Sequence, residues 1–480
     1  MELNSPRTLA MHTTMSVQKN CISCGFRHML AVGERGRSVF AYGEGQYGQL
    51  GAGTRAHQRT PAPAAGLEGL PDVVMVCAGD RHSAAVTSAG ALLLWGDNYF
   101  GQLGHGDKED RLVPVTLCLL RFGGAPVAMV ACGAFHTLVV TRAGGLFAFG
   151  NGEFGQLGLG DRNNRDVPVG VGPGRLGGAI IVYAAAGAGQ SGVVTSDGGV
   201  WTWGRGQCGC LGHNDEQDEL VPRELKGEFG GARALSLAAG GAHTMVVTTC
   251  GAVWGCGSGE DGQLGVGNTA DRHAPVRVGG EETFGQSKVH MVTCGTDHTV
   301  AVTEEGALWT WGLKNICVPG QEMLVPTRVG QEFFGGAKIR TASCGAAVSV
   351  ALSEDGALFT WGAPDWLGLP PVLGHDDVQD NLVPTMVDPD LLLGTRIGRG
   401  LALPPLMALA FAMGTHRRLG AGDMGAASGC RGGRKSLRAA GKEPAAKRED
   451  AGSPIQALAG ELGLVWMIVE MCVDKVQVQP

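Results

Sequence analysis

The sequence is poor in charge. Charged side chains make up 17% of its 480 residues, and 38 Lys and Arg are outnumbered by 45 Asp and Glu, for a formal net charge of −7. A chain with this balance lacks the basic face through which proteins bind nucleic acid, so we expect no direct nucleic-acid binding. With 44% apolar residues, the chain as a whole is also too hydrophobic to be disordered.

Long hydrophobic runs are missing as well. The nearest candidate, residues 455–473, is interrupted by Glu461 and Glu470, and the first residues contain no apolar segment of signal-peptide length. We therefore expect no membrane association and a cytoplasmic or nuclear location, or both. In such a compartment the 14 cysteines are expected to be reduced thiols.

A second Cys-x-x-Cys pair is also lacking. Cys21-x-x-Cys24 and Cys208-x-Cys210 suggest zinc ligands, but a structural zinc site needs four ligands, usually as two close pairs. Cys24 shares its repeat position with other cysteines, which favours small buried thiols. The sequence predicts neither a metal nor a cofactor.

Glycine, by contrast, is abundant, with 81 residues. Each interior glycine costs a helix about 1 kcal/mol, so a mostly helical protein is excluded. A turn-rich, all-β protein is what this composition favours.

Four short markers recur in the same order along seven copies of a repeat, although the sixth copy lacks the third marker and the seventh copy is irregular. The first is Cys-Gly or Ala-Gly, two variable residues and a histidine; its histidines are His28, His82, His136, His243 and His298, with Gln190 and Val348 in the two degenerate copies. The second is an aromatic residue before glycine, including Trp95, Trp203, Trp311 and Trp361. The third is Gly-Gln-Leu-Gly, and the fourth is a proline that usually follows valine.

Each repeat predicts a small antiparallel sheet. The β-branched segment 136–141, a Gly144-Gly145 turn and the returning segment 146–149 form a hairpin pattern. The Gly-Gln-Leu-Gly loop needs positive φ angles, and the proline is expected to open the outer strand. One such sheet cannot bury both faces, whereas seven arranged radially can. The sequence therefore predicts a seven-bladed β-propeller of about 54-residue repeats.

With its His, Trp-Gly and Gly-Gln-Leu-Gly markers, the repeat resembles the regulator of chromosome condensation repeat family over roughly residues 21–384. We expect an N-terminal extension over 1–20, a propeller over 21–416, a disordered basic linker over 417–452 and a C-terminal helix over 453–473. Blades are expected to start near residues 21, 75, 129, 183, 236, 291 and 341. A strand near 406–413 is expected to pair with N-terminal residues and fasten the ring.

The repeat markers are interpreted as structural. One histidine per blade places these side chains around a ring, too far apart to form a catalytic or metal site. We expect each histidine to hydrogen-bond the backbone of its own blade, and the tryptophans to lie in the core. The plant UV-B photoreceptor of this family uses tryptophans within Gly-Trp-Arg-His-Thr-type motifs. No tryptophan stands in the two variable positions before each histidine here, so we do not expect this chain to be a photoreceptor.

Two functions remain open. The first is a non-catalytic protein-interaction scaffold or adaptor, whose rim contacts would be Arg27, Asp80, Arg81, Phe135 and Asp297. Its net negative charge favours a basic partner, a ubiquitination component is one candidate partner, and we expect a monomer.

The alternative, implied by the resemblance, is guanine-nucleotide exchange on a Ran-like small GTPase. Asp80 matches an acidic position of the family's exchange factor, and Asp297 is similar. However, blades of this length leave little room for that factor's wedge-like insertion.

Overall fold

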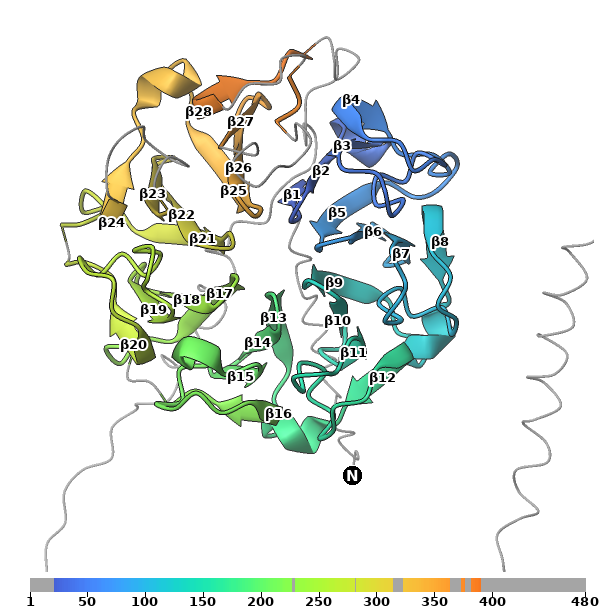
Figure 1. The fold of residues 1–480 in the computed structure, drawn as a ribbon, viewed down its shortest axis with the longest axis horizontal. Helices are drawn as coiled ribbons and strands as arrows, with labels where there is room; N and C mark the ends of the chain where they lie inside the picture. Colours follow the sequence, from blue (N-terminus) through green and yellow to red (C-terminus); the bar gives the residue numbers. More distant parts are fainter. Residues whose placement is uncertain are drawn as a thin grey trace, which may run out of the picture. The chain divides into compact units, whose positions relative to one another are not determined.

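The described residues of this computed structural model are 21–226, 229–280, 282–313, 323–362, 373–375 and 381–389. They form seven four-stranded antiparallel sheets arranged in a ring, shown in Figure 1. The expected all-β, seven-bladed β-propeller is confirmed. Among these residues the only helices are short 3-10 turns: η1 (Glu34–Gly36), η2 (Leu119–Phe122), η3 (Pro173–Leu176), η4 (Gln207–Gly209) and η5 (Gln331–Phe334).

Each blade uses four consecutive strands, which run from the ring centre outward, and we number the blades 1 to 7 along the chain. The innermost strands are β1 (Ile22–Cys24), β5 (Val73–Ala78), β9 (Val127–Cys132), β13 (Ile181–Ala186), β17 (Ala234–Ala239), β21 (Val289–Cys294) and β25 (Ile339–Cys344). The second strands are β2 (His28–Val32), β6 (His82–Thr87), β10 (His136–Thr141), β14 (Gln190–Thr195), β18 (His243–Thr248), β22 (His298–Thr303) and β26 (Val348–Ser353).

The third strands are β3 (Val39–Gly43), β7 (Leu92–Gly96), β11 (Leu146–Gly150), β15 (Val200–Gly204), β19 (Val253–Gly257), β23 (Leu308–Gly312) and β27 (Leu358–Gly362). The outermost strands are β4 (Gln58–Pro63), β8 (Arg111–Leu117), β12 (Arg165–Val171), β16 (Glu219–Glu224), β20 (Arg272–Arg277), β24 (Met323–Arg328) and β28 (Asn381–Met386). The second and third strands are almost entirely buried, because both of their faces pack against neighbouring blades.

The predicted hairpin between β10 and β11 is present. Val140 pairs with Leu146, and Gly144 makes the turn at a φ of 80°. A residue with a side chain would be strained at that angle, which is why glycine stands in this turn.

The marker proline lies inside the outer strand, so the expectation that it opens this strand is wrong. Pro114 is the fourth residue of β8, beside a register shift between Leu94 and Gly96 of β7. Proline lacks an amide hydrogen, and an outermost strand at an irregular register tolerates that loss.

The repeat histidines bridge neighbouring blades, which corrects the expectation that they bond backbone within their own blade. His136 Nε2 lies 2.8 Å from Ser191 Oγ of the next blade. The same bridge joins His28 to Ser83, His82 to Thr137, His243 to Thr299 and His298 to Ser349. Each histidine therefore holds a seam between two blades.

The tryptophan and Gly-Gln-Leu-Gly markers meet the histidine at the same seam. Ser191 Oγ and Trp203 Nε1 each donate to the Gln156 carbonyl oxygen, at 2.8 Å. Because the hydroxyl hydrogen points to Gln156, the hydroxyl accepts the Nε2 hydrogen of His136. Equivalent Trp–Gln bonds involve Trp95 with Gln49 and Trp311 with Gln263. Three repeat markers thus form one clamp between adjacent blades.

The ring closes through glycine. A side chain on Gly345 of blade 7 would collide with the Gly25 carbonyl oxygen of blade 1. At every other seam, a side chain on the marker glycine would collide in the same way with the carbonyl oxygen of the next blade's marker glycine. Cys24 N also donates to Ser343 Oγ across this closing seam, at 2.9 Å. Val348 replaces the histidine there, so the seam has an apolar core. The expected closing strand 406–413, the segments 1–20 and 417–452 and the helix 453–473 lie outside the described residues.

Candidate functional site

The loops between first and second strands and between third and fourth strands leave the sheets at one end, because neighbouring strands are antiparallel. We call this end of the ring the loop face and the opposite end the hairpin face. The loop face carries all five predicted rim residues, since each stands between a first and a second strand. Rigid sheets hold these loops, which is the usual arrangement for a recognition surface.

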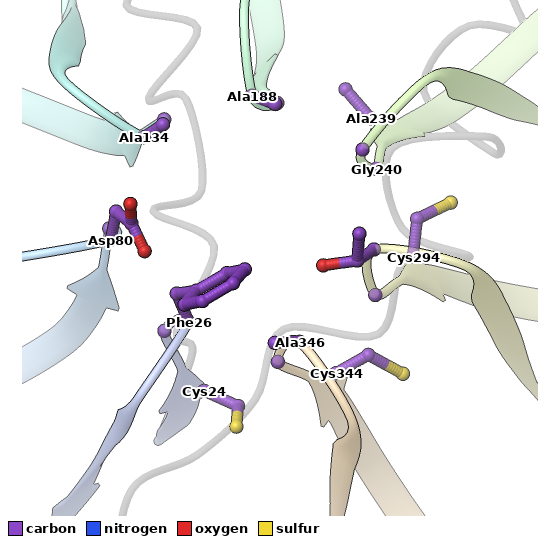
Figure 2. A pocket seen from close by; sticks show the side chains of 18 of the residues that line it. Cys24, Phe26, Asp80, Ala134, Ala188, Ala239, Gly240, Cys294, Cys344 and Ala346 are labelled. Carbon is purple, nitrogen blue, oxygen red and sulfur yellow. The ribbon is translucent and has the colours of Figure 1, made fainter. Parts of the chain in front are cut away.

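A cavity of about 180 Å³ occupies the ring centre and is lined by residues of all seven blades. Phe26 and Asp80 project into it, while Ala134, Ala188 and Ala346 leave it open (Figure 2). Burial raises the pKa of Asp80 to about 6, against the opposing effect of the Arg81 and Arg27 charges. None of the residues lining this cavity is a tryptophan.

Arg81 lies between two aromatic rings from neighbouring blades. Its Cζ is 4.4 Å from the ring centroid of Tyr47 in blade 1 and 5.5 Å from that of Phe135 in blade 3. Phe135 in turn contacts Phe100, with ring centroids 5.3 Å apart. The structure therefore brings together Asp80, Arg81 and Phe135, three of the five predicted rim residues.

The other two rim residues differ in their neighbours, since the Arg27 charge reaches Asp80 whereas Asp297 lies among carboxylates. Arg27 of blade 1 pairs with Glu44 at 3.6 Å. Asp297 of blade 6 lies near Asp261 and Glu260, and burial together with these two negative charges raises the pKa of Asp297 to about 6. The loop face thus carries arginines on blades 1 and 2, and a group of three neighbouring carboxylates, Asp297, Asp261 and Glu260, on blades 5 and 6.

Several residues of this face were missed by sequence reasoning. Arg205 of blade 4 stacks on Phe154 of blade 3, with its Cζ 4.9 Å from the ring centroid. Tyr99 is 69% exposed and meets Phe100 edge-on at 4.9 Å. A signal was present, because the residue before Gly-Gln-Leu-Gly is aromatic in three consecutive copies, at Tyr47, Phe100 and Phe154.

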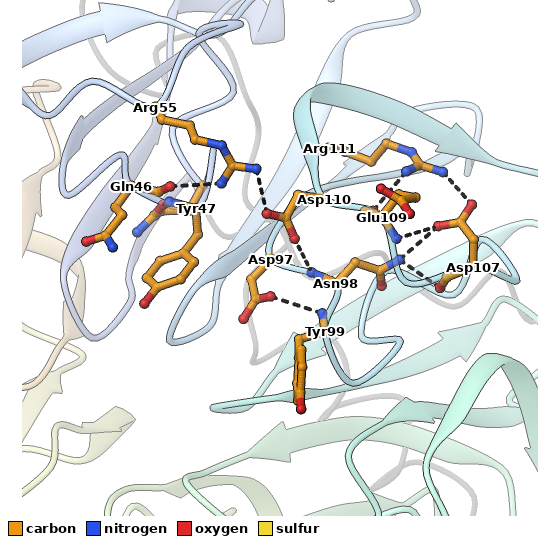
Figure 3. A network of polar contacts seen from close by, with 11 residues as sticks. Gln46, Tyr47, Arg55, Asp97, Asn98, Tyr99, Asp107, Glu109, Asp110 and Arg111 are labelled. Atoms are coloured by element: carbon orange, nitrogen blue, oxygen red, sulfur yellow. Dashed lines mark hydrogen bonds and ion pairs between the residues drawn. The ribbon is translucent and has the colours of Figure 1, made fainter.

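A polar network holds the seam between blades 1 and 2 on this face (Figure 3). Arg55 donates to Asp110 at 2.8 Å and to the Gln46 carbonyl oxygen at 2.9 Å. Tyr99 N donates to Asp97 Oδ1 at 3.0 Å. Beside this network lies a pocket of about 510 Å³, lined among others by Tyr47, Tyr99 and Arg81. Fixed charges and aromatic rings therefore surround a hollow that a partner side chain can enter.

The described part of the chain holds no group of three or more His, Cys, Asp or Glu arranged to bind a metal ion. None of its helices has the length and apolarity to cross a bilayer. Its cysteines form no disulfide, and Cys24, Cys132 and Cys344 are buried at equivalent positions of three blades.

The fold and its repeated seams define a seven-bladed propeller with a charged, aromatic loop face. A family profile for the RCC1-like domain matches residues 2–235, and profiles for the regulator of chromosome condensation (RCC1) repeat match residues 251–302 and 289–317. The chain belongs to the regulator of chromosome condensation repeat family.

This chain is similar to several curated proteins over part of their length. The ultraviolet-B receptor UVR8 of Arabidopsis thaliana is 39% identical over 61% of this chain and 64% of that protein. The human E3 ubiquitin-protein ligase HERC2 is 34% identical over 62% of this chain and 6% of that protein. The chain therefore spans less than two thirds of these relatives.

Solved structures share the fold. Human WBSCR16 superposes with a TM-score of 0.64 and 23% identity, covering 73% of this chain and 94% of that one. Prp20p from Saccharomyces cerevisiae gives a TM-score of 0.60 and 24% identity, covering 69% of this chain and 81% of that one. At these identities the likeness supports the propeller fold.

Proposed function

We propose that this propeller is a non-catalytic protein-interaction module whose partner docks on the loop face. The observation that carries the proposal is the row of stacked, partly exposed aromatic and arginine side chains across blades 1 to 4. Tyrosine and arginine dominate the energetics of protein interfaces, because they bury a large area and make directional hydrogen bonds. Stacking also fixes these side chains before binding, which reduces the entropy lost on docking.

The charges on the face indicate what it recognises. Arg81 and Arg205 form no ion pair with another described residue, so their N–H groups remain available for carboxylates of a partner. Asp297 and its acidic neighbours on blades 5 and 6 suit basic side chains. The partner surface proposed here is therefore of mixed charge. A ubiquitination component is a candidate partner, because HERC2 is a ubiquitin-protein ligase by name.

Affinity capture with matched surface variants tests this function. The full chain is used as bait, with partners quantified by mass spectrometry for wild type, Tyr99→Ser/Arg81→Gln, and Leu120→Ser. Leu120 is a suitable control because it is 77% exposed and follows an outermost strand, at the hairpin face. We expect the loop-face variant to lose a specific partner by about tenfold or more, while the control retains it. Loss with the control alone, or equal capture by all three baits, rejects the loop face as the docking surface.

Guanine-nucleotide exchange on a Ran-like small GTPase is a second candidate. The observation in its favour is Asp80, a partly exposed carboxylate at the centre of the loop face. Release of fluorescent GDP from purified Ran-like GTPases is measured with wild type, Asp80→Asn and the hairpin-face control Leu120→Ser. Acceleration that only Asp80→Asn abolishes supports exchange. No acceleration by wild type rejects exchange and does not affect the docking proposal.

A further inference from the structure

The seam between blades 2 and 3 contains two facing cysteines. Cys77 is the second-last residue of β5, and Cys132 is the last residue of β9. At the other six seams the equivalent residue pairs contain at most one cysteine: Ser23/Ala78, Ala131/Ala186, Ala185/Ala239, Ala238/Cys294, Thr293/Cys344 and Ser343/Cys24. This seam is therefore chemically different from its six counterparts.

The two side chains point toward one another across the seam. Cys132 N donates to Cys77 Sγ at 3.2 Å, and Cys132 Sγ donates to the Cys77 carbonyl oxygen at 3.7 Å. An amide nitrogen lies about 1.5 Å from its own Cα, so Cys77 Sγ is at most about 4.7 Å from Cys132 Cα. A disulfide requires Cβ atoms about 3.5–4.5 Å apart, and the side-chain hydrogen bond between Cys77 and Cys132 already brings the two sulfurs toward each other.

We propose that Cys77 and Cys132 are an oxidisable thiol pair that forms a reversible disulfide between blades 2 and 3. The bond would join two sheets that otherwise meet only through non-covalent contacts at this seam. It would also strengthen a seam whose clamp is incomplete, because Phe149 stands where blades 2, 4, 6 and 7 have tryptophan. The Gln102 carbonyl oxygen therefore accepts a side-chain hydrogen bond from Thr137 and none from an indole.

The surroundings give the two thiols different roles. Hydrogen bonding from Cys132 lowers the pKa of the Cys77 thiol, and Ser23 adds to this effect against the opposing effect of burial. Burial raises the pKa of the Cys132 thiol. Cys77 is also partly exposed, whereas Cys132 is buried beside the central cavity. Cys77 is therefore the thiol that reacts first with an oxidant.

A peroxide is the oxidant required. The Cys77 thiolate attacks one peroxide oxygen, the O–O bond breaks, and the second oxygen leaves as water after taking a proton, which yields a sulfenic acid. The Cys132 sulfur then attacks the Cys77 sulfur. The S–S bond forms, the S–O bond breaks, and the Cys132 proton leaves with that oxygen as a second water. Two thiols lose two electrons and one peroxide becomes two waters, while a dithiol reductant reverses the change.

Thiol titration and peptide mapping of the full chain test the proposal. Reduced protein is treated with hydrogen peroxide, remaining thiols are alkylated, and linked peptides are identified by mass spectrometry. We expect about two thiols per chain to disappear first, with Cys77 linked to Cys132. The thermal unfolding midpoint of the oxidised protein is expected to rise, and dithiothreitol should restore both the thiols and the original midpoint.

The chain offers variants that should fold. Cys77→Ser introduces the residue found at this position in blades 1 and 7, and Cys132→Ala introduces the residue found at its position in blades 2, 4 and 5. Either variant is expected to abolish the linkage and the rise in midpoint. The control Cys344→Ala, on a seam where the facing residue is Thr293, should leave both intact. Persistence of both thiols, oxidation of Cys77 to sulfinic acid without a link, or a link to another cysteine overturns the proposal.

Discussion

Replacing a single seam histidine should test whether the clamps hold the ring together. His136 is fully buried, and its Nε2 bonds Ser191 of the next blade. His136→Ala deletes this bond and leaves a cavity, which together cost about 3 kcal/mol of unfolding free energy. Blade 4 supplies the matched replacement, because Gln190 occupies the equivalent position and its Nε2 donates to the Gly240 carbonyl oxygen of blade 5 at 3.0 Å.

His136→Gln can therefore keep a donor across the seam, and we expect it to cost only about 1 kcal/mol. Both variants are compared with wild type by denaturant unfolding, followed by tryptophan fluorescence. A double-mutant cycle with Ser191→Ala should give a coupling of about 1 kcal/mol between the two side chains. If His136→Gln is as costly as His136→Ala, or if the two alanine changes are additive, the clamp does not stabilise the seam as described.

Three further outcomes follow from the same structure. Burial lowers the pKa of the five repeat histidines to about 3 or 4, below the unfolded value of 6.5, so the unfolded chain binds protons first and stability present above pH 6.5 is lost on acidification. At about pH 5 each histidine should lower the free energy of unfolding by roughly 2 kcal/mol. Asp80 and Asp297 partly offset this loss, because their raised pKa values act in the opposite direction. Circular dichroism measured against pH should therefore show unfolding near about pH 5. Gly133→Ala should destabilise the ring by about 3 kcal/mol or more in denaturant unfolding, because a Cβ there lies 2.6 Å from the Gly187 carbonyl oxygen; an unchanged midpoint would contradict this close approach. Trp203→Phe should cost about 2 kcal/mol in the same assay, from the lost indole hydrogen bond and lost apolar area, and a cost near zero would show that the bond contributes nothing.

Much of the fold could be predicted because its signals are local. The turn glycine Gly144 and the strands on either side of it lie within a few residues, so periodicity and turn chemistry reveal them together. The proline was placed at the wrong point of the outer strand, because a register shift arises from pairing with β7 rather than from the outer strand itself.

The candidate site was predicted in part. Arg81 and Phe135 were chosen because the positions before each histidine vary between repeats. Tyr47 was missed although it stacks on Arg81, since it belongs to a different loop of the preceding blade. A repeated sequence shows which positions are equivalent, whereas contact between loops of two blades depends on how the sheets stack.

The sequence by itself determined the number of blades, the strands and the turns, because each is encoded within one repeat. Only the tertiary structure decided which repeat positions face one another across a seam. Neighbouring sheets place His136 opposite Ser191, 55 residues away, and bring Cys77 to Cys132 although these two occupy different positions of the repeat. Those contacts depend on the angle and offset at which rigid sheets pack, which no single repeat contains.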